Sequence, residues 1–130
     1  MLRVVLDTNV IVSGVISARG APRRVLEAWA TGLFAVITAP VLIREVEDAL
    51  RYERIRVRYG LSEADIRAVL ALLWVEADVI DDPLPGDVLA LTGDPDDDVL
   101  VAVARSAGAS HVVSGDRKVR AADLGGDPLV

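Results

Sequence analysis

The sequence predicts a three-layer α/β domain in which helices flank a central parallel sheet. Short runs of β-branched residues alternate along the chain with segments of helical periodicity, and this order builds a parallel sheet that is covered on both faces. A composition of 52% hydrophobic and 26% charged residues is too apolar for a disordered chain. Two of the runs end at an aspartate, Asp7 or Asp116. Because α/β proteins bind ligands beyond the carboxyl ends of their strands, a functional site is expected at that edge of the sheet.

The first expected strand is Leu2–Leu6, an apolar run that stops at Asp7. A helix is expected over residues 23–31, because its apolar residues have helical spacing and Gly32 follows it. Phe34–Thr38 reads as the second strand.

The next helix is expected through residues 42–50. Thr38 is its expected N-cap, and Pro40 is tolerated in a first helical turn. After it, Ser62 and Asp65 have the spacing of a capping box. They open an amphipathic helix whose apolar residues are expected in the core: Ile66, Val69, Leu70 and Leu73. Core positions are also expected for Trp29 and Trp74.

The last third of the chain begins with a segment rich in proline and glycine. Residues 81–96 are expected to form a surface connection with one short extended piece at 88–91. Residues 97–107 start with acids and end at Gly108, as a helix does. Residues 111–114 read as the strand that leads to Asp116.

One domain over residues 1–130 is expected, because the chain has the length of a single domain and lacks an internal repeat or linker. The chain has no cysteine, which agrees with a reducing compartment, so a cytoplasmic location is expected. Its N-terminus lacks the pattern of a signal peptide. No membrane association is expected, since the longest uncharged apolar stretch, residues 33–43, is shorter than the roughly 18 residues that a span needs.

The formal net charge of −6 is unevenly distributed. Nine acidic residues and no basic ones lie between Glu76 and Asp98. The charge that affects a ligand is the charge around its site, so the overall acidity does not exclude a polyanionic partner.

Four acidic residues can meet at the carboxyl edge of the sheet: Asp7, Glu45, Asp97 and Asp116. Clustered carboxylates repel one another unless a cation neutralises them. Oxygen ligands alone suit Mg²⁺ or Mn²⁺, which can activate water for attack on a phosphodiester. Asp98 is an alternative to Asp97 as the third ligand, because residues 96–98 are consecutive aspartates, and Glu47 is an alternative to Glu45.

Three short polar side chains accompany these acids. Thr8 and Asn9 follow Asp7 directly and are expected to orient its carboxylate, and Ser114 precedes Asp116 by two positions.

The segments that contain these residues, VVLDTNVIVSGVIS, GLFAVITAPVLIREVEDALRYERIRVRYGLS, DPDDD and AGASHVVSGDRKV, resemble the PIN-domain nucleases. The similarity is to the small VapC-like toxins of bacterial toxin–antitoxin pairs. It implies a ribonuclease that depends on Mg²⁺ or Mn²⁺, with an RNA substrate, a cognate antitoxin and a homodimer. The four acidic ligands of the family fall on Asp7, Glu45, Asp97 and Asp116.

Two groups of basic residues are candidates for RNA contact. Arg51 and Arg54 lie beside tyrosines that could stack on bases, and Arg117 and Lys118 directly follow Asp116. The first group could equally be a solvated helix face or a docking surface for the antitoxin.

The main alternative function is a PIN-like module that binds RNA or protein with weak catalysis or none. Other enzyme classes fit poorly. His111 is the only histidine, which excludes a histidine-pair ribonuclease, and no glycine-rich phosphate loop is present. An aspartyl phosphatase would need a second aspartate two residues after Asp7, where Asn9 stands.

Overall fold

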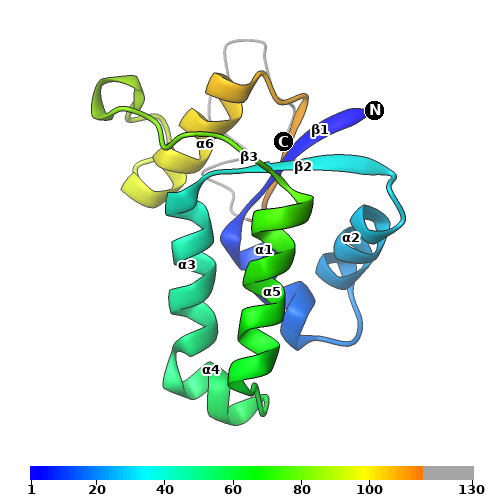
Figure 1. The fold of residues 1–130 in the computed structure, drawn as a ribbon. Helices are drawn as coiled ribbons and strands as arrows, with labels where there is room; N and C mark the ends of the chain where they lie inside the picture. The colour runs from blue at the N-terminus through cyan, green and yellow to red at the C-terminus, as the bar shows by residue number, and fades with distance from the viewer. Residues whose placement is uncertain (116–130) are drawn as a thin grey trace.

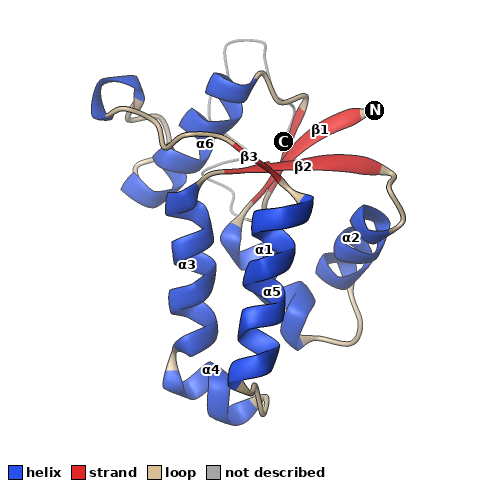
Figure 2. Ribbon diagram, viewed as in Figure 1, coloured by secondary structure: helices blue, strands red, loops and turns tan. Residues whose placement is uncertain are grey.

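A computed structural model describes residues 1–115 and confirms the predicted α/β class (Figures 1 and 2). Its sheet has four parallel strands in the order β3-β2-β1-β4. The strands are β1 (Leu2–Leu6), β2 (Phe34–Thr38), β3 (Asp78–Val79) and β4 (His111–Val113). The helices are α1 (Thr8–Ile16), α2 (Ala21–Ala30), α3 (Pro40–Arg51), α4 (Glu53–Arg58), α5 (Glu63–Glu76) and α6 (Pro95–Ala107), with a 3₁₀ turn at Pro85–Asp87.

The central strand β1 pairs with β2 on one side and with β4 on the other. The chain moves outward from β1 through β2 to β3, and then returns through α6 to place β4 on the opposite side of β1. The strand order therefore reverses at β1. In open parallel sheets, ligands bind at such a reversal point, beyond the carboxyl ends of the strands.

The two faces of the sheet pack against different helices. Val5, Ile37 and Val112 contribute to a core with α6, where Val103 is fully buried. The alternate strand residues, Val4, Leu6 and Val36, belong to a second core with α1, α3 and α5. The period of two along each strand produces this division, because successive side chains point to opposite faces.

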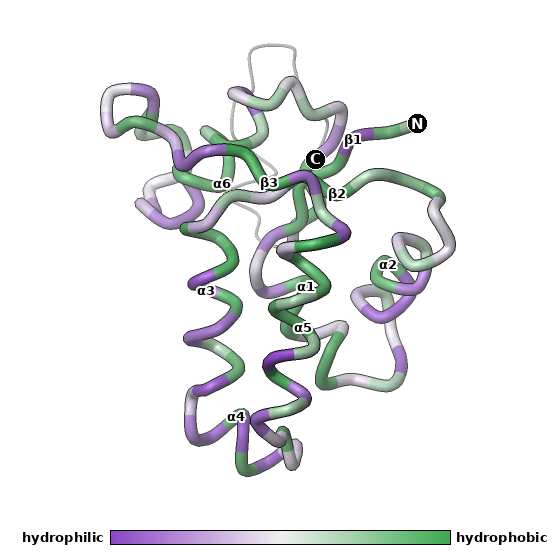
Figure 3. The backbone as a smooth tube through the Cα atoms, in the orientation of Figure 1, coloured by the Kyte–Doolittle hydropathy of each residue, from purple (hydrophilic) through white to green (hydrophobic). Residues whose placement is uncertain are grey.

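Helices α3 and α5 run side by side away from the sheet, and α4 joins them at their far end (Figure 1). Hydrophobic and hydrophilic residues alternate along α3, as expected of a helix with one buried side (Figure 3). Its buried residues are Leu42, Ile43, Val46 and Leu50.

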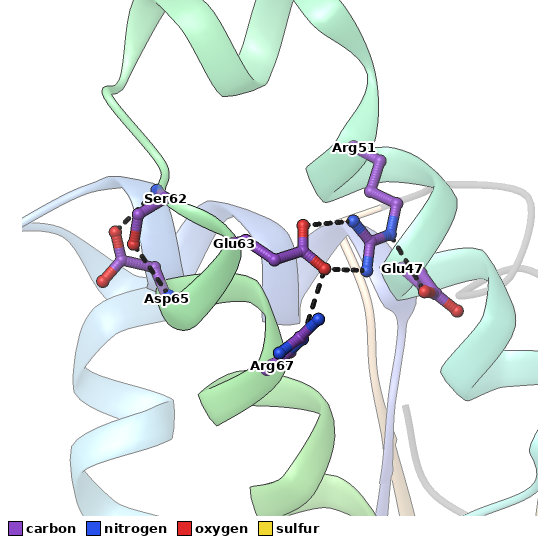
Figure 4. Close-up of polar contacts among 6 residues, drawn as sticks. All are labelled: Glu47, Arg51, Ser62, Glu63, Asp65 and Arg67. Carbon is purple, nitrogen blue, oxygen red and sulfur yellow. Dashed lines mark hydrogen bonds and ion pairs between the residues drawn. The ribbon is translucent and has the colours of Figure 1, made fainter.

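Local start and stop signals predicted several elements well. Both β1 and β2 have the predicted bounds. The capping box of α5 is present: the Asp65 amide donates to Ser62 Oγ at 3.0 Å, and the Ser62 amide donates to Asp65 Oδ2 at 2.9 Å (Figure 4). Gly108 ends α6 in the left-handed conformation, with φ 62°.

Other expectations were wrong. The N-cap of α3 is Ala39, not Thr38, because β2 continues to Thr38 and buries it. Residues 88–91 pair with no strand of the sheet, although the backbone of Val88 is extended, with φ −88° and ψ 110°. Trp74 is 51% exposed instead of filling the core. Trp29 packs against the core, as expected.

Three elements were not predicted: α1, α4 and β3. The run that forms α1 is rich in β-branched residues, which favour strands. It is helical because Asp7 caps it and because burial of Val10, Ile11 and Val12 outweighs the weak helix propensity. Among residues 1–115, every helix is too short or too polar to cross a lipid bilayer.

Candidate active site

A cavity of about 320 Å³ opens at the carboxyl end of β1, between the first turns of α1 and α6 and one side of α3. This is the reversal point of the sheet. Residues 1–115 contribute six carboxylates to the lining and no lysine or arginine. The residues that line it are Asp7, Thr8, Asn9, Leu42, Glu45, Asp48, Ala49, Asp94, Asp96, Asp97 and Leu100.

Asp7 lies at the junction of β1 and α1 and is only 6% exposed. Its Oδ1 accepts a hydrogen bond from the Asn9 amide at 3.1 Å, which caps α1. Its Oδ2 accepts a hydrogen bond from the Ser114 hydroxyl at 2.6 Å. Parallel pairing brings Ser114 there, because the Asp7 amide also donates to the Val113 carbonyl at 2.9 Å. Both carboxylate oxygens of Asp7 are therefore oriented by the protein.

Glu45 reaches the same cavity from α3. The Thr8 hydroxyl donates to Glu45 Oε2 at 2.9 Å. The sequence predicts that Thr8 orients Asp7, but in the structure Thr8 orients Glu45. Asn9 supports Asp7 through its backbone amide.

The electrostatic surroundings of Glu45 disfavour its charged form. Burial raises the pKa of Glu45, and the carboxylates of Asp96, Asp7 and Asp48 raise it further. The hydrogen bond from Thr8 opposes this effect but does not cancel it, so the pKa stays above its usual value. A site with these properties favours a cation.

Asp97 and Asp98 follow one another in the first turn of α6 but lie in different surroundings. Asp97 lines the cavity, and Asp98 does not. Asp98 is 6% exposed, and its Oδ1 accepts hydrogen bonds from the Leu91 amide at 3.0 Å and from the amide and hydroxyl of Thr92, both at 2.8 Å. Burial raises the pKa of Asp98, but these hydrogen bonds outweigh it and hold the pKa below its usual value. Asp98 therefore anchors the loop before α6.

The other predicted residues lie elsewhere. Asp116, Arg117 and Lys118 are outside the described residues. Arg51 and Arg54 are exposed and do not line the cavity. Arg51 forms ion pairs with Glu47 at 2.9 Å and with Glu63 at 2.6 Å (Figure 4). These hydrogen bonds raise the pKa of Arg51 above its usual value.

Three further carboxylates line the cavity and were not singled out from the sequence: Asp48, Asp94 and Asp96. A signal for Asp48 was present, because residues three apart on a helix share a face and Asp48 follows Glu45 by three. Asp94 is the N-cap of α6 and accepts a hydrogen bond from the Asp96 amide at 2.9 Å.

The donor chemistry of the cavity fits a divalent cation. Asp7, Glu45 and Asp97 offer only hard oxygen ligands, which Mg²⁺ and Mn²⁺ prefer. Within residues 1–115, no three acidic, histidine or cysteine side chains are gathered into a complete metal site.

Comparison with known proteins identifies relatives of this chain. A sequence model described as "PIN domain" matches residues 3–118. No curated protein matches. Among solved structures, the chain is similar to the crystal structure of PAE2754 from Pyrobaculum aerophilum, with a TM-score of 0.59 and 20% sequence identity. The match covers 93% of this chain and 78% of that one.

Proposed function

This chain belongs to the PIN-domain family, and from that premise we propose that it is an endoribonuclease that hydrolyses RNA phosphodiesters with the help of Mg²⁺ or Mn²⁺. PIN domains are generally nucleases that use divalent metal ions.

One observation carries the proposal. Asp7, Glu45 and Asp97 come from three separate elements and line one cavity, to which residues 1–115 contribute no basic side chain. Carboxylates gathered in one cavity repel one another and destabilise the folded protein unless they bind a cation, because each negative charge disfavours the ionised form of its neighbours.

Asp7, Glu45 and Asp97, together with Asp116, would hold the metal. When bound, a divalent cation lowers the pKa of water and stabilises charge on phosphate oxygens. The chain contributes carboxylates whose positions are set in advance. Ser114 and the Asn9 amide orient Asp7, and Thr8 orients Glu45.

We also propose a biological role and binding partners for this nuclease. The resemblance to VapC-like proteins supports a toxin with a cognate antitoxin, a homodimer and a cytoplasmic location. A small reading frame beside the gene that encodes a protein able to inhibit the nuclease would support the toxin role.

The test is cleavage of labelled single-stranded RNA and DNA by the purified full chain. We expect RNA to be cut with Mn²⁺ or Mg²⁺ and left intact with a chelator. Asp7→Asn should reduce the rate by at least about a hundredfold, because it removes one anionic ligand of the site while it keeps the helix cap.

Asp87→Asn is the matched control, since Asp87 is exposed and does not line the cavity; its rate should equal that of the parent. Cleavage that persists in chelator, or an undiminished rate for Asp7→Asn, would refute the metal mechanism. RNA binding without turnover would identify a binding module instead.

A further inference from the structure

A second hollow, of about 520 Å³, lies at the far end of α3 from the sheet. It is shallow and open, and Figure 1 shows α4 at this end of the molecule. Its lining residues are Tyr52, Glu53, Arg54, Val57 and Arg58.

Helical periodicity places Tyr52, the residue of the hollow that adjoins α3, on the same face of α3 as the carboxylate cavity. Tyr52 follows Glu45 by seven residues, which is close to two full turns, and it follows Ala49 by three. Tyr52 directly follows α3; its φ of −57° is still helical and places its side chain on this face, and its ψ of 125° ends the helix and turns the chain into α4. At 1.5 Å per residue, Tyr52 lies about 10 Å along α3 from Glu45.

The side chains of the hollow are suited to a single-stranded nucleic acid. Tyr52 is 57% exposed, so a base can stack on its ring. Within residues 1–115, the arginines found in ion pairs are Arg3, Arg23, Arg51 and Arg67. Arg54 and Arg58 are exposed and outside these pairs.

Two neighbouring contacts hold this part of the chain in place. The Arg58 guanidinium lies over the Tyr59 ring, 5.5 Å from its centroid. Arg51 joins the end of α3 to the start of α5 through Glu63, on the two sides of α4 (Figure 4). The Arg51–Glu63 ion pair therefore links the two ends of the α3–α4–α5 connection.

We propose that Tyr52, Arg54 and Arg58 form a subsite, here the α4 subsite, for the single-stranded RNA that flanks the scissile phosphate. A base stacks on Tyr52, and the two arginines contact backbone phosphates. This inference rests on the proposed nuclease function, because the carboxylate cavity supplies the point of cleavage. The shared face of α3 favours RNA over an acidic protein segment, since one strand can pass from the cavity to Tyr52.

Binding can be measured by fluorescence anisotropy with a labelled oligouridylate of about ten nucleotides, in an Asp7→Asn background with Mg²⁺. Tyr52→Ala should weaken binding about tenfold and leave its salt dependence unchanged, because stacking is not ionic. Tyr52→Phe should bind like the parent. The double variant Arg54→Ala, Arg58→Ala should reduce the slope of log affinity against log salt by about 0.7 per arginine.

Two exposed residues outside the hollow provide matched controls, Trp74 for the aromatic side chain and Arg105 for the cation. Trp74→Ala and Arg105→Ala should bind like the parent. All variants should keep the parent melting temperature, since the replaced side chains are exposed.

Cleavage kinetics separate this inference from the function on which it rests. In the active protein, Tyr52→Ala should raise KM for the ten-nucleotide RNA about tenfold and leave cleavage of a dinucleotide unchanged. If neither RNA is cut by the parent with Mn²⁺, the nuclease proposal fails, and the anisotropy series still tests the subsite. Unchanged affinity and KM in the Tyr52 and double-arginine variants would overturn the subsite, as would an equal loss in the controls. Tighter binding of polyglutamate than of RNA at these residues would also overturn it.

Discussion

At the scale of single residues, the site is built from pairs in which a neutral side chain orients a carboxylate. Ser114 donates to Asp7, and Thr8 donates to Glu45, which is 37 positions away in the chain. A hydrogen bond to a metal-ligating carboxylate affects metal affinity although its donor does not contact the metal, because it orients the ligand.

Replacement of Thr8 tests this role. Thr8→Val keeps the shape of the side chain but removes the hydroxyl that holds Glu45, so we expect Mn²⁺ affinity to fall about 10- to 100-fold. Thr8→Ser keeps the hydroxyl and should retain the parent affinity. Titration calorimetry measures both, and an unchanged affinity in Thr8→Val would show that the hydrogen bond does not position Glu45.

The raised pKa of Glu45 predicts a dependence of stability on pH in the absence of metal. The folded protein binds this proton more tightly than the unfolded chain, whose glutamates have a pKa near 4.5. The resulting stabilisation is complete below that pH and is lost as the pH rises through the raised value.

Glu45→Gln mimics the protonated form and still accepts a hydrogen bond from Thr8. In chelator we expect it to raise the melting temperature by a few degrees at neutral pH and to have no effect at about pH 4, where Glu45 is protonated in both states. Thermal denaturation at the two pH values provides the comparison. A clear loss of stability at neutral pH would contradict the expected repulsion.

Asp97 and Asp98 should respond to replacement in opposite ways. Asp98→Ala leaves the Leu91 and Thr92 donors without their acceptor, so its melting temperature should fall by several degrees in chelator. Asp97→Ala should change the melting temperature little but weaken Mn²⁺ binding more than tenfold. If the two variants had the same melting temperature and the same Mn²⁺ affinity, the assignment of Asp97 to metal binding and of Asp98 to the loop before α6 would be wrong.

At the scale of elements, α1 and α2 approach closely because Gly14 has no side chain. A Cβ atom at Gly14 would lie 2.5 Å from Leu26 Cδ1 and 2.9 Å from the Pro22 carbonyl oxygen. The carbonyl belongs to the backbone, so it cannot move aside without a shift of α2. Position 14 therefore requires glycine because the two helices are so close there, and not because the backbone has a positive φ.

We expect Gly14→Ala to destabilise the protein by about 1–3 kcal/mol through overpacking, even though alanine favours a helix by about 1 kcal/mol over glycine. Urea denaturation measures the change. Gly86→Ala is the control, because a Cβ there meets nothing within 4 Å. If Gly14→Ala were as stable as the parent, α2 would have to be free to shift away from α1.

A second link between elements lies on the surface. Arg51 joins α3 to α5 through both oxygens of Glu63, at 2.6 and 2.9 Å, and Glu63 also pairs with Arg67 (Figure 4). Exposed ion pairs contribute little to stability because solvent and salt screen them. These pairs connect the end of α3 to the start of α5, beside the proposed α4 subsite.

At the scale of the whole molecule, the site depends on three layers that meet at one sheet edge. Helices α1 and α3 cover one face of the sheet, α6 covers the other, and Asp7 directly follows the central strand β1. A ligand that joins their carboxylates should therefore stabilise the complete fold and not one element.

We expect Mn²⁺ at about a hundredfold excess over its Kd to stabilise the folded protein by about 2.7 kcal/mol, a rise in melting temperature on the order of 10 °C for a domain of this size. Asp7→Asn should lose most of the rise, whereas Asp87→Asn should retain it. A melting curve that does not respond to Mn²⁺ would count against a metal site.

Much of the fold could be predicted because its signals are local. The capping box at Ser62, the glycine that ends α6 and the apolar runs of β1 and β2 each lie within a few residues of the structure they specify. The helix α1 was not predicted in this way, because its β-branched residues favour a strand and they are helical through burial against other elements in addition to the Asp7 cap.

The sequence by itself determined the α/β class and the placement of acids at strand ends, since alternating periodicity and strand-terminal residues are properties of neighbouring positions. Tertiary structure alone decided which acids share a cavity. The sequence favoured Asp97 but left Asp98 as an alternative, and the way α6 packs on the sheet directs Asp97 to the cavity and Asp98 to the Thr92 loop. Likewise, Thr8 meets Glu45 only because α1 and α3 cover the same face of the sheet. The physical reason is that the rotation of a helix about its axis is set by the burial of its apolar side, which involves residues far apart in the chain.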